Sequence, residues 1–338
     1  MAMTIYDISK KAGVSIATVS RVLNGSENVR PSTRKKVMDV IDKYDYTPNA
    51  FARGMGLHSL KTIGILCADS SDLFLAKAVY FLEQELQANG YESLLCCTGY
   101  NLDIKKNYLN LILSKKVDSI ILVGSNFIGS TEDENQYIKD VSTQVPIMLL
   151  SASFDYPNVY STLCDDYGTM FEATTEMIQA GITDILYLYD SKSYSGLKKL
   201  HGFRDAMKEH NIPGFEKLIH FYDGNIEHLD EIADFVAGIA KKGASFHGIM
   251  TSDDSLAIGS IKYAQKKRIR IPEDLSVMGY NNSMLTNCCT PELTSVDNRL
   301  ETQTHQLVQT LLGVLAGEEM PKKSIFSGKI IKRGTTLF

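Results

Sequence analysis

TIYDISKKAGVSIATVSRVL, residues 4–23, contains two short amphipathic segments joined by one tight turn. Apolar residues recur at helical spacing in the first segment, and Gly13 then offers the left-handed backbone that ends a helix. Ser15 is a good N-cap for the second segment. The inward-facing residues that we expect are Ile5, Ile8 and Ala12 in the first helix and Val19, Val22 and Leu23 in the second. The stretch therefore predicts a helix-turn-helix.

The outward face of the second helix carries side chains that suit the major groove of DNA. Arg21 can read guanine with two hydrogen bonds, while small hydroxyl and methyl groups bind phosphates or touch thymine. The other residues of this face are Ile16, Ala17, Thr18 and Ser20. A helical hairpin without a partner would show the same amphipathicity, and that plainer interpretation stays open on these residues alone.

Two further segments extend this N-terminal part. Pro31-Ser32-Thr33 predicts the start of a third helix, with Ser32 or Thr33 as its cap. Residues 49–57, NAFARGMGL, predict a short helix weakened by two glycines, at a cost of about 1 kcal/mol each relative to alanine. We expect this last helix to form only against DNA and a symmetry-related copy.

Charge divides the chain in the same place. Residues 1–60 hold nine Lys and Arg and five Asp and Glu, a net charge of +4, within a chain whose net charge is −5. The remaining 278 residues therefore carry a net charge of −9. A basic N-terminal part on an acidic body concentrates the attraction to phosphates in one place, although an ordinary solvated helical surface could also carry +4.

The motifs TIYDISKKAGVS, TVSRVLNG, VRPSTRKKV and Y-x-PNA-x-AR follow one another without gaps. In this order they resemble the headpiece of the LacI/GalR family of bacterial transcription regulators, and most of all its catabolite control protein subgroup. A looser similarity continues to about residue 337, so the resemblance covers nearly the whole chain. It implies a sequence-specific DNA-binding regulator, with repression as the expected mode, that binds a pseudo-palindromic operator as a homodimer.

The resemblance also assigns roles to individual residues. Bases would be read by Ile16, Ala17 and Arg21, while most of the others would contact phosphates, and Met55 would insert into the minor groove as a lever that kinks the duplex. The full set expected to contact DNA is Thr4, Ile5, Tyr6, Ser15, Ile16, Ala17, Thr18, Ser20, Arg21, Asn24, Thr33, Asn49, Ala52, Arg53 and Met55.

Size and composition are those of an ordinary globular protein of several units. The chain has 338 residues, of which 44% are hydrophobic and 22% charged, and it has no long apolar run or N-terminal apolar segment that would indicate a membrane span or export. Its six cysteines fit neither a disulfide framework nor a zinc site. We therefore expect a cytoplasmic protein with reduced thiols, no membrane association and no cofactor.

From residue 61 onward, short apolar runs alternate with longer amphipathic segments. The expected strands are 62–68, 91–97, 118–124, 146–152, 184–190, 217–223, 248–252, 275–281 and 329–335. The expected helices are 76–89, 104–115, 138–143, 168–179, 198–210, 229–241, 255–266 and 300–316. This alternation predicts an α/β fold with doubly wound parallel sheets in two similar lobes, and such sheets bind ligands beyond the carboxyl ends of their strands.

The family resemblance implies a body similar to periplasmic sugar-binding proteins, with three crossovers between the lobes. It divides the chain into a headpiece at 1–48, a hinge helix and linker at 49–60, an N-lobe at 61–162 plus 292–326, and a C-lobe at 163–291 plus 327–338. No leucine heptad follows Leu337, so we expect a dimer and not a tetramer held by a coiled coil.

Strand ends facing the cleft offer carboxylates, amides and an aromatic ring, which suit a sugar-like polyol effector. The candidates for effector contact are Asp69, Asp72, Phe74, Ser125, Asp165, Lys199, Asp253 and Asn281. Each of these residues could instead be a turn or N-cap residue with a purely structural role.

Two departures from the family pattern concern this cleft. Lys199 stands where sugar-responsive members carry arginine, and Asn281 stands where they carry aspartate, so a bidentate grip on sugar hydroxyls is lost. The effector is therefore expected to be atypical, or the cleft no longer binds one. The catabolite control subgroup also binds a phosphorylated carrier protein, but residues 301–309 lack the tyrosine and arginine which that contact needs, so this corepressor is not supported.

Enzyme interpretations find little support. Ser195 and Lys198 have S-x-x-K spacing, but the companion motifs of penicillin-recognising enzymes are missing. The seven histidines show no metal-ligand spacing, and no phosphate-binding glycine motif occurs. The main alternative to a regulator is a solute-binding protein or sugar-acting enzyme on the same two-lobed fold, and residues 1–57 are what argue against it.

Overall fold

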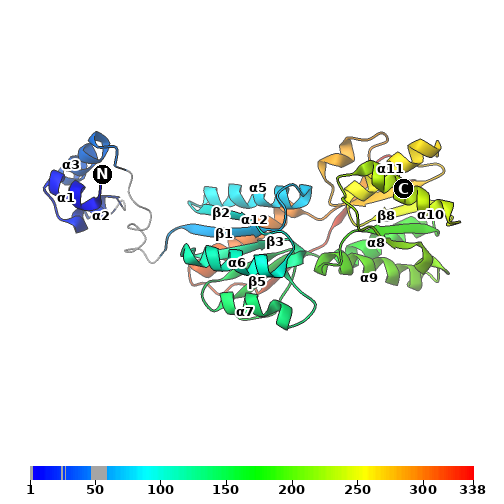
Figure 1. Cartoon of the computed structure of the whole chain (residues 1–338), viewed down its shortest axis with the longest axis horizontal. Helices are drawn as coiled ribbons and strands as arrows, with labels where there is room; N and C mark the ends of the chain where they lie inside the picture. Colours follow the sequence, from blue (N-terminus) through cyan, green and yellow to red (C-terminus); the bar gives the residue numbers. More distant parts are fainter. Residues whose placement is uncertain (1–2, 24–25, 27, 47–58) are drawn as a thin grey trace.

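The computed structural model describes residues 3–23, 26, 28–46 and 59–338. Its N-terminal part, the headpiece, consists of three helices: α1 (Ile5–Ala12), α2 (Ile16–Leu23) and α3 (Pro31–Lys43) (Figure 1). Ile8, Val19 and Val37 lie at its centre with no exposed surface. Each helix therefore buries one apolar stripe, as the 3.6-residue spacing predicts, and leaves its polar face to solvent.

The body contains two six-stranded sheets, one in each lobe (Figure 1). The first sheet has the order β11-β5-β4-β3-β1-β2, and its neighbouring strands are all parallel. Its strands are β1 (Thr62–Cys67), β2 (Glu92–Cys97), β3 (Ser119–Val123), β4 (Ile147–Leu150), β5 (Val159–Cys164) and β11 (Lys323–Phe326).

Helices cover both faces of the first sheet. One face packs against α5 (Leu73–Ala88) and α12 (Leu300–Leu315), through a core that includes Leu82 and Leu311. The other face packs against α6 (Leu102–Ser114) and α7 (Gln136–Ser142), through a core that includes Leu109 and Ile138. The inner strands β1, β3 and β4 are buried on both faces, which explains why they appear in the sequence as continuous apolar runs.

The second sheet repeats this plan with the order β12-β10-β9-β8-β6-β7, in which only β12 is antiparallel to its neighbour. Its strands are β6 (Ile185–Tyr189), β7 (Ile219–Phe221), β8 (Gly248–Thr251), β9 (Ser276–Tyr280), β10 (Thr294–Asp297) and β12 (Lys329–Ile331). The helices are α8 (Asp166–Gln179), α9 (Tyr194–Glu209), α10 (Leu229–Lys241) and α11 (Asp254–Lys267). Four short 3₁₀ turns lie at Ser125–Phe127, Asp133–Asn135, Phe215–Leu218 and Met284–Asn287.

The lobes exchange chain at three points, and the second lies later than expected. The first crossover follows Cys164 and the third lies between Phe326 and Lys329, close to the expected boundaries. Residues 292–297, assigned to the N-lobe from the family resemblance, belong instead to the C-lobe. The reason is that β10 pairs in parallel with β9, with Thr294 opposite Met278, and buries Val296 in the C-lobe core.

Most expected elements are found within a few residues, and the differences lie in short ones. The patterns did not predict β5, β10 or β11, which are four to six residues long. The expected strand 217–223 begins as a 3₁₀ turn and is a strand only over Ile219–Phe221. The third helix is preceded by Arg30 and not capped by Ser32 or Thr33, because Pro31 already has the φ angle of a first helical residue.

Candidate DNA-reading face and interlobe cleft

The turn between α1 and α2 is built from local hydrogen bonds. Thr4 and Asp7 form a capping box at the start of α1, in which the Thr4 amide donates to Asp7 Oδ2 over 3.0 Å. Gly13 has a φ angle of 63°, a left-handed conformation that ends α1. Ser15 Oγ accepts a hydrogen bond from the Thr18 amide at 3.1 Å, which starts α2. The crossing of the two helices is thus fixed by side chains within the motif itself.

The outer face of α2 exposes three of its side chains to solvent. Val19 and Val22 point into the headpiece core, whereas Ile16 is 39% exposed and Ala17 and Arg21 are exposed. Thr18 and Ser20 are half-buried at the sides of this face. An exposed isoleucine beside an exposed arginine, on a helix whose other face is fully packed, fits the readout of base edges in a major groove.

The other residues expected to contact DNA are placed as follows. Thr4 and Tyr6 are exposed at the start of α1, Tyr6 to 68%, while Ile5 packs partly against the headpiece core. Thr33 is half-buried in the first turn of α3. The remaining expected contacts, which include the lever, lie outside the described residues: Asn24, Asn49, Ala52, Arg53 and Met55.

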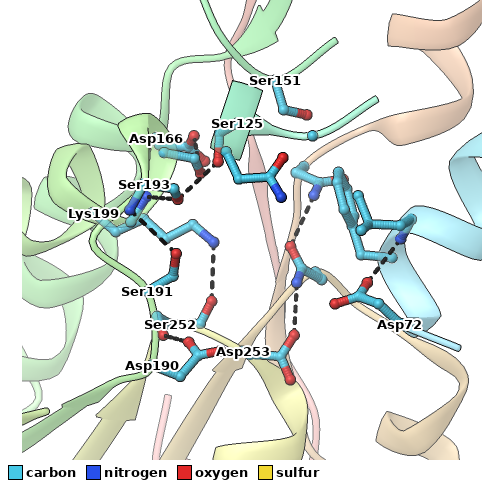
Figure 2. Close-up of a pocket in the computed structure, with 18 of the residues that line it drawn as sticks. Asp72, Ser125, Ser151, Asp166, Asp190, Ser191, Ser193, Lys199, Ser252 and Asp253 are labelled. Carbon is cyan, nitrogen blue, oxygen red and sulfur yellow. Dashed lines mark hydrogen bonds between the residues drawn. The ribbon is translucent and has the colours of Figure 1, made fainter. Parts of the chain in front are cut away.

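Between the two sheets lies a cavity of about 150 Å³, lined by residues from both lobes (Figure 2). Six of the eight residues expected to contact an effector line it: Asp72, Phe74, Ser125, Lys199, Asp253 and Asn281. Asp69 instead lines a neighbouring cavity, which shares Asp72, Asp190 and Asp253 with the first. Asp165 lines neither cavity, because its side chain caps α8 by accepting from the Gly168 amide at 3.0 Å.

Lys199 is held inside the C-lobe and does not extend freely into the cavity. Its Nζ donates to the main-chain oxygen of Ser252 at 2.9 Å, and it lies 3.9 Å from the centre of the Tyr280 ring. Only 7% of the residue is exposed. The ammonium of Lys199 therefore makes both a hydrogen bond and a cation–π contact within the protein. Figure 2 shows the side chain extended toward Ser252.

Four carboxyl groups line the cavity, from Asp72, Asp166, Asp190 and Asp253. Burial raises the pKa of Asp72 to about 6, although the Leu75 amide opposes that rise. Burial is also the main cause of the raised pKa of Asp190, and the neighbouring carboxylate of Asp253 adds to it. Each carboxyl group accepts at least one hydrogen bond from the protein. Asp72 accepts from Leu75 N, and Asp190 accepts from Ser252 Oγ. Asp166 accepts from Tyr280 Oη and Ser195 Oγ, and Asp253 accepts from Asn281 Nδ2 and Ser255 N.

Three amide side chains continue from Asp253 in a hydrogen-bonded series. Asn281 Nδ2 donates to Asp253 Oδ2 at 2.9 Å, Asn298 Nδ2 donates to Asn281 Oδ1 at 3.0 Å, and Gln303 Nε2 donates to the main-chain oxygen of Asn298 at 2.6 Å. This series joins β9, the crossover after β10 and the first turns of α12, so it spans both lobes. Asn281, expected to replace a sugar-gripping aspartate, therefore also serves to orient Asp253.

The sequence did not single out several residues that line the cavity. Asp190 directly follows β6, so the strand-end reasoning applied to other positions would have found it. Asp165 was the expected contact at the end of β5, but it is its neighbour Asp166 that lines the cavity. Tyr100, Asn298 and Gln303 come from a loop, a crossover and a helix, and no local pattern marked them.

Within the part of the chain that the structure describes, no helix is long and apolar enough to cross a membrane. The same residues contain no group of three or more His, Cys, Asp or Glu side chains placed to hold a metal ion.

A helix-turn-helix headpiece followed by a two-lobed body with an interlobe cavity defines a DNA-binding regulator. The chain matches the bacterial regulatory proteins of the lacI family over residues 4–49 and a periplasmic binding protein-like domain over residues 174–336. An HTH-type transcriptional regulator of Lachnoclostridium phytofermentans is 49% identical over 336 residues, which are 99% of this chain and 100% of that protein. The chain therefore belongs to the LacI family of transcription regulators, which confirms the resemblance and the predicted fold class.

Other relatives agree. Catabolite control protein A of Priestia megaterium is 32% identical over 303 residues, 88% of this chain and 87% of that protein. The crystal structure of the lac repressor dimer bound to operator and the anti-inducer ONPF shares the fold over 100% of both chains, with a TM-score of 0.87 at 20% identity. The protein is a DNA-binding transcriptional regulator, as its headpiece indicated.

Proposed function

We propose that the chain binds a pseudo-palindromic operator as a homodimer and that a polyol effector in the interlobe cleft modulates its affinity for DNA. The observation that carries the DNA-reading part is the outer face of α2. Ile16, Ala17 and Arg21 are exposed together on a helix whose opposite face, with Val19 and Val22, is buried. We assign base contacts to these three residues, and contacts that are mainly to phosphates to Thr4, Tyr6, Ser15, Thr18, Ser20 and Thr33.

Exposed apolar groups on the N-lobe support a homodimer. β2 is the last strand of the first sheet, so one of its edges is unpaired. Leu94 and Leu95 on this strand are 38% and 43% exposed, and Tyr80 on the adjacent α5 is 52% exposed. Exposed leucines on an edge strand are unfavourable in a monomer, and a second copy of the chain would cover them.

Coupling between cleft and headpiece follows from the crossovers. Three chain segments join the lobes beside the cavity, so a ligand that draws the lobes together would rotate one N-lobe against its partner's. Such a coupling free energy is typically about 1–3 kcal/mol, or about 5- to 150-fold in operator affinity. Asp72 and Phe74 of the N-lobe face Lys199, Asp253 and Asn281 of the C-lobe across this cavity, which supports a ligand held by both lobes.

The test is selection of duplexes from a random pool by the full-length protein at low salt, followed by sequencing of the retained DNA. We expect enrichment of two half-sites related by an approximate two-fold axis, with retention that falls steeply as salt increases. Selection of a single unsymmetrical site would contradict the homodimer, and the absence of any enrichment would contradict sequence-specific reading by α2.

A further inference from the structure

The donors and acceptors in the cleft are unevenly used. The side-chain nitrogens of Asn281, Asn298 and Gln303 each donate one hydrogen bond within the protein. The side-chain oxygens of the last two accept none, because Asn298 Oδ1 and Gln303 Oε1 are buried without a hydrogen-bond partner. Only 5% of Asn298 and 1% of Gln303 is exposed, so solvent does not readily satisfy these oxygens. A third such oxygen, Asn126 Oδ1, lines the same cavity.

The cavity also has more acidic than basic side chains in its lining. The cavity is lined by four aspartates and one lysine, and the ammonium of that lysine, Lys199, already contacts Ser252 and the Tyr280 ring. None of the four carboxylates lies within 4.0 Å of a cationic nitrogen of another described residue, although the charge of Lys199 acts on Asp166 and Asp190 from further away. The neighbouring cavity, which shares Asp72, Asp190 and Asp253 with this one, adds Asp69 and Glu227. The nearby ammonium of Lys105 donates to the main-chain oxygen of Asn126 and lines a separate cavity.

From these two observations we infer that the effector is a cationic, amine-bearing polyol of the amino-sugar class, and that the cleft rejects phosphorylated sugars. The inference rests on the proposed function, since it names the ligand class of that same cleft. Unpartnered carbonyl oxygens call for a ligand rich in donors, and four carboxyl groups beside one ammonium call for a positive charge. A phosphate would bring negative charge and further acceptors to a cavity already lined by four carboxyl groups.

The ammonium of the ligand is placed nearest Asp190 and Asp253. These two carboxylates lie side by side in Figure 2, below Lys199, and each raises the negative potential at the other. Asp253 Oδ1 and Oδ2 each accept one hydrogen bond, and Asp190 Oδ1 accepts one, which leaves further lone pairs for a ligand. A ligand ammonium between them would offset the repulsion between the two carboxylates.

The first experiment is calorimetric titration of the full-length protein with matched pairs of ligands. The pairs are glucosamine with glucose, galactosamine with galactose, and mannosamine with mannose, and glucose 6-phosphate is the anionic probe. In the pair whose stereochemistry fits, we expect the amine to bind about tenfold tighter than the neutral sugar, since a charge-assisted hydrogen bond exceeds a neutral one by roughly that factor. Glucose 6-phosphate should bind more weakly than glucose.

The outcomes separate this inference from the proposed function. If a neutral or phosphorylated sugar binds as tightly as its amine and changes operator affinity, the amine inference is wrong and the proposed regulation by a polyol stands. If no member of any pair binds, both the amine inference and the polyol effector are overturned, while operator binding is unaffected.

Substitutions of single carboxylates test which of them cause the preference for the amine. Asp190→Asn and Asp253→Asn each remove one charge but keep an oxygen that can accept from Ser252 Oγ or Asn281 Nδ2. We expect each variant to lose most of the preference for the amine while its affinity for the neutral sugar changes less. Asp234→Asn is the matched control, because this carboxylate lies on the surface in an ion pair with Lys266 and does not line the cavity.

A last measurement does not depend on the variants folding. With the wild-type protein, affinity for the amine should fall as ionic strength rises, whereas affinity for the neutral sugar should stay nearly constant. Equal salt dependence within the fitting pair would overturn the inference, because the ligand charge would then play no part in binding.

Discussion

Asp254 offers a test of how the burial of a carboxyl group next to the cleft residue Asp253 lowers the free energy of unfolding. It lies beside Asp253 with 1% of its surface exposed, and it accepts hydrogen bonds of 2.6 Å from the Ser283 amide and the Ser295 hydroxyl. Burial raises the pKa of Asp254 from 3.8 to about 7, and the charge on Asp253 adds to the rise. The carboxylate joins the start of α11 to the ends of β9 and β10, which carry the amide series of the cleft.

The sign of the pH effect follows from which state keeps the proton. As pH rises from 3.8 to about 7, the unfolded chain loses the proton of Asp254 while the folded chain retains it, so the free energy of unfolding falls. About three pKa units at 1.36 kcal/mol each correspond to a loss of up to about 4 kcal/mol, complete above the folded pKa. Asp254→Asn removes this loss, because the amide is neutral at every pH.

The asparagine can keep both contacts. Its oxygen can accept from the Ser283 amide, and its amino group can donate to the Ser295 hydroxyl, which is able to accept. Between pH 5 and pH 8 the stability of the variant relative to wild type should therefore rise by about 2.7 kcal/mol. The assay is urea denaturation at a series of pH values, with the surface variant Asp234→Asn as the control for removal of one negative charge.

One result would refute this reasoning. If the difference in stability between Asp254→Asn and wild type were the same at pH 5 and pH 8, Asp254 would not retain its proton in the folded protein. A rise equal to that of Asp234→Asn would instead assign the effect to net charge and not to burial.

Four further predictions concern the headpiece and the expected hinge helix that follows it. Arg21→Ala should weaken operator binding by roughly 1–3 kcal/mol and relax specificity at one base pair per half-site; equal losses on all duplexes would make Arg21 a phosphate contact. Ile8→Ala, at a position with no exposed surface, should destabilise the headpiece by about 2–5 kcal/mol and abolish operator retardation while the body unfolds as in wild type; full retardation would contradict that core role. Gly13→Ala, at a φ angle of 63°, should cost about 1–2 kcal/mol, and Gly13→Asn less, in thermal denaturation of the headpiece; equal costs would argue against backbone strain. Met55→Ala should reduce DNA bending in a fluorescence assay without altering the body, whereas unchanged bending would dispose of the lever.

Much of the site for DNA could be predicted because its information is local. The caps, the glycine turn and the 3.6-residue stripe of α1 and α2 all lie within twenty consecutive residues, so the sequence defines which face is buried and which is exposed. The cleft is different. Asp72 and Asp253 follow recognisable strands, and Lys199 lies in the expected helix before Gly202-Phe203, so these three could be nominated. Asn298 and Gln303 reach the cavity only because the chain crosses between lobes there.

By itself, the sequence determined the helix-turn-helix, the two α/β lobes and the outward position of Ile16, Ala17 and Arg21, because periodicity and capping act between near neighbours. Tertiary structure alone decided that β10 belongs to the C-lobe, that Asp166 and not Asp165 lines the cleft, and that Lys199 is engaged with Ser252 and Tyr280. These outcomes depend on which strands pair and which donors are already used, and both are set by contacts between residues far apart in the chain.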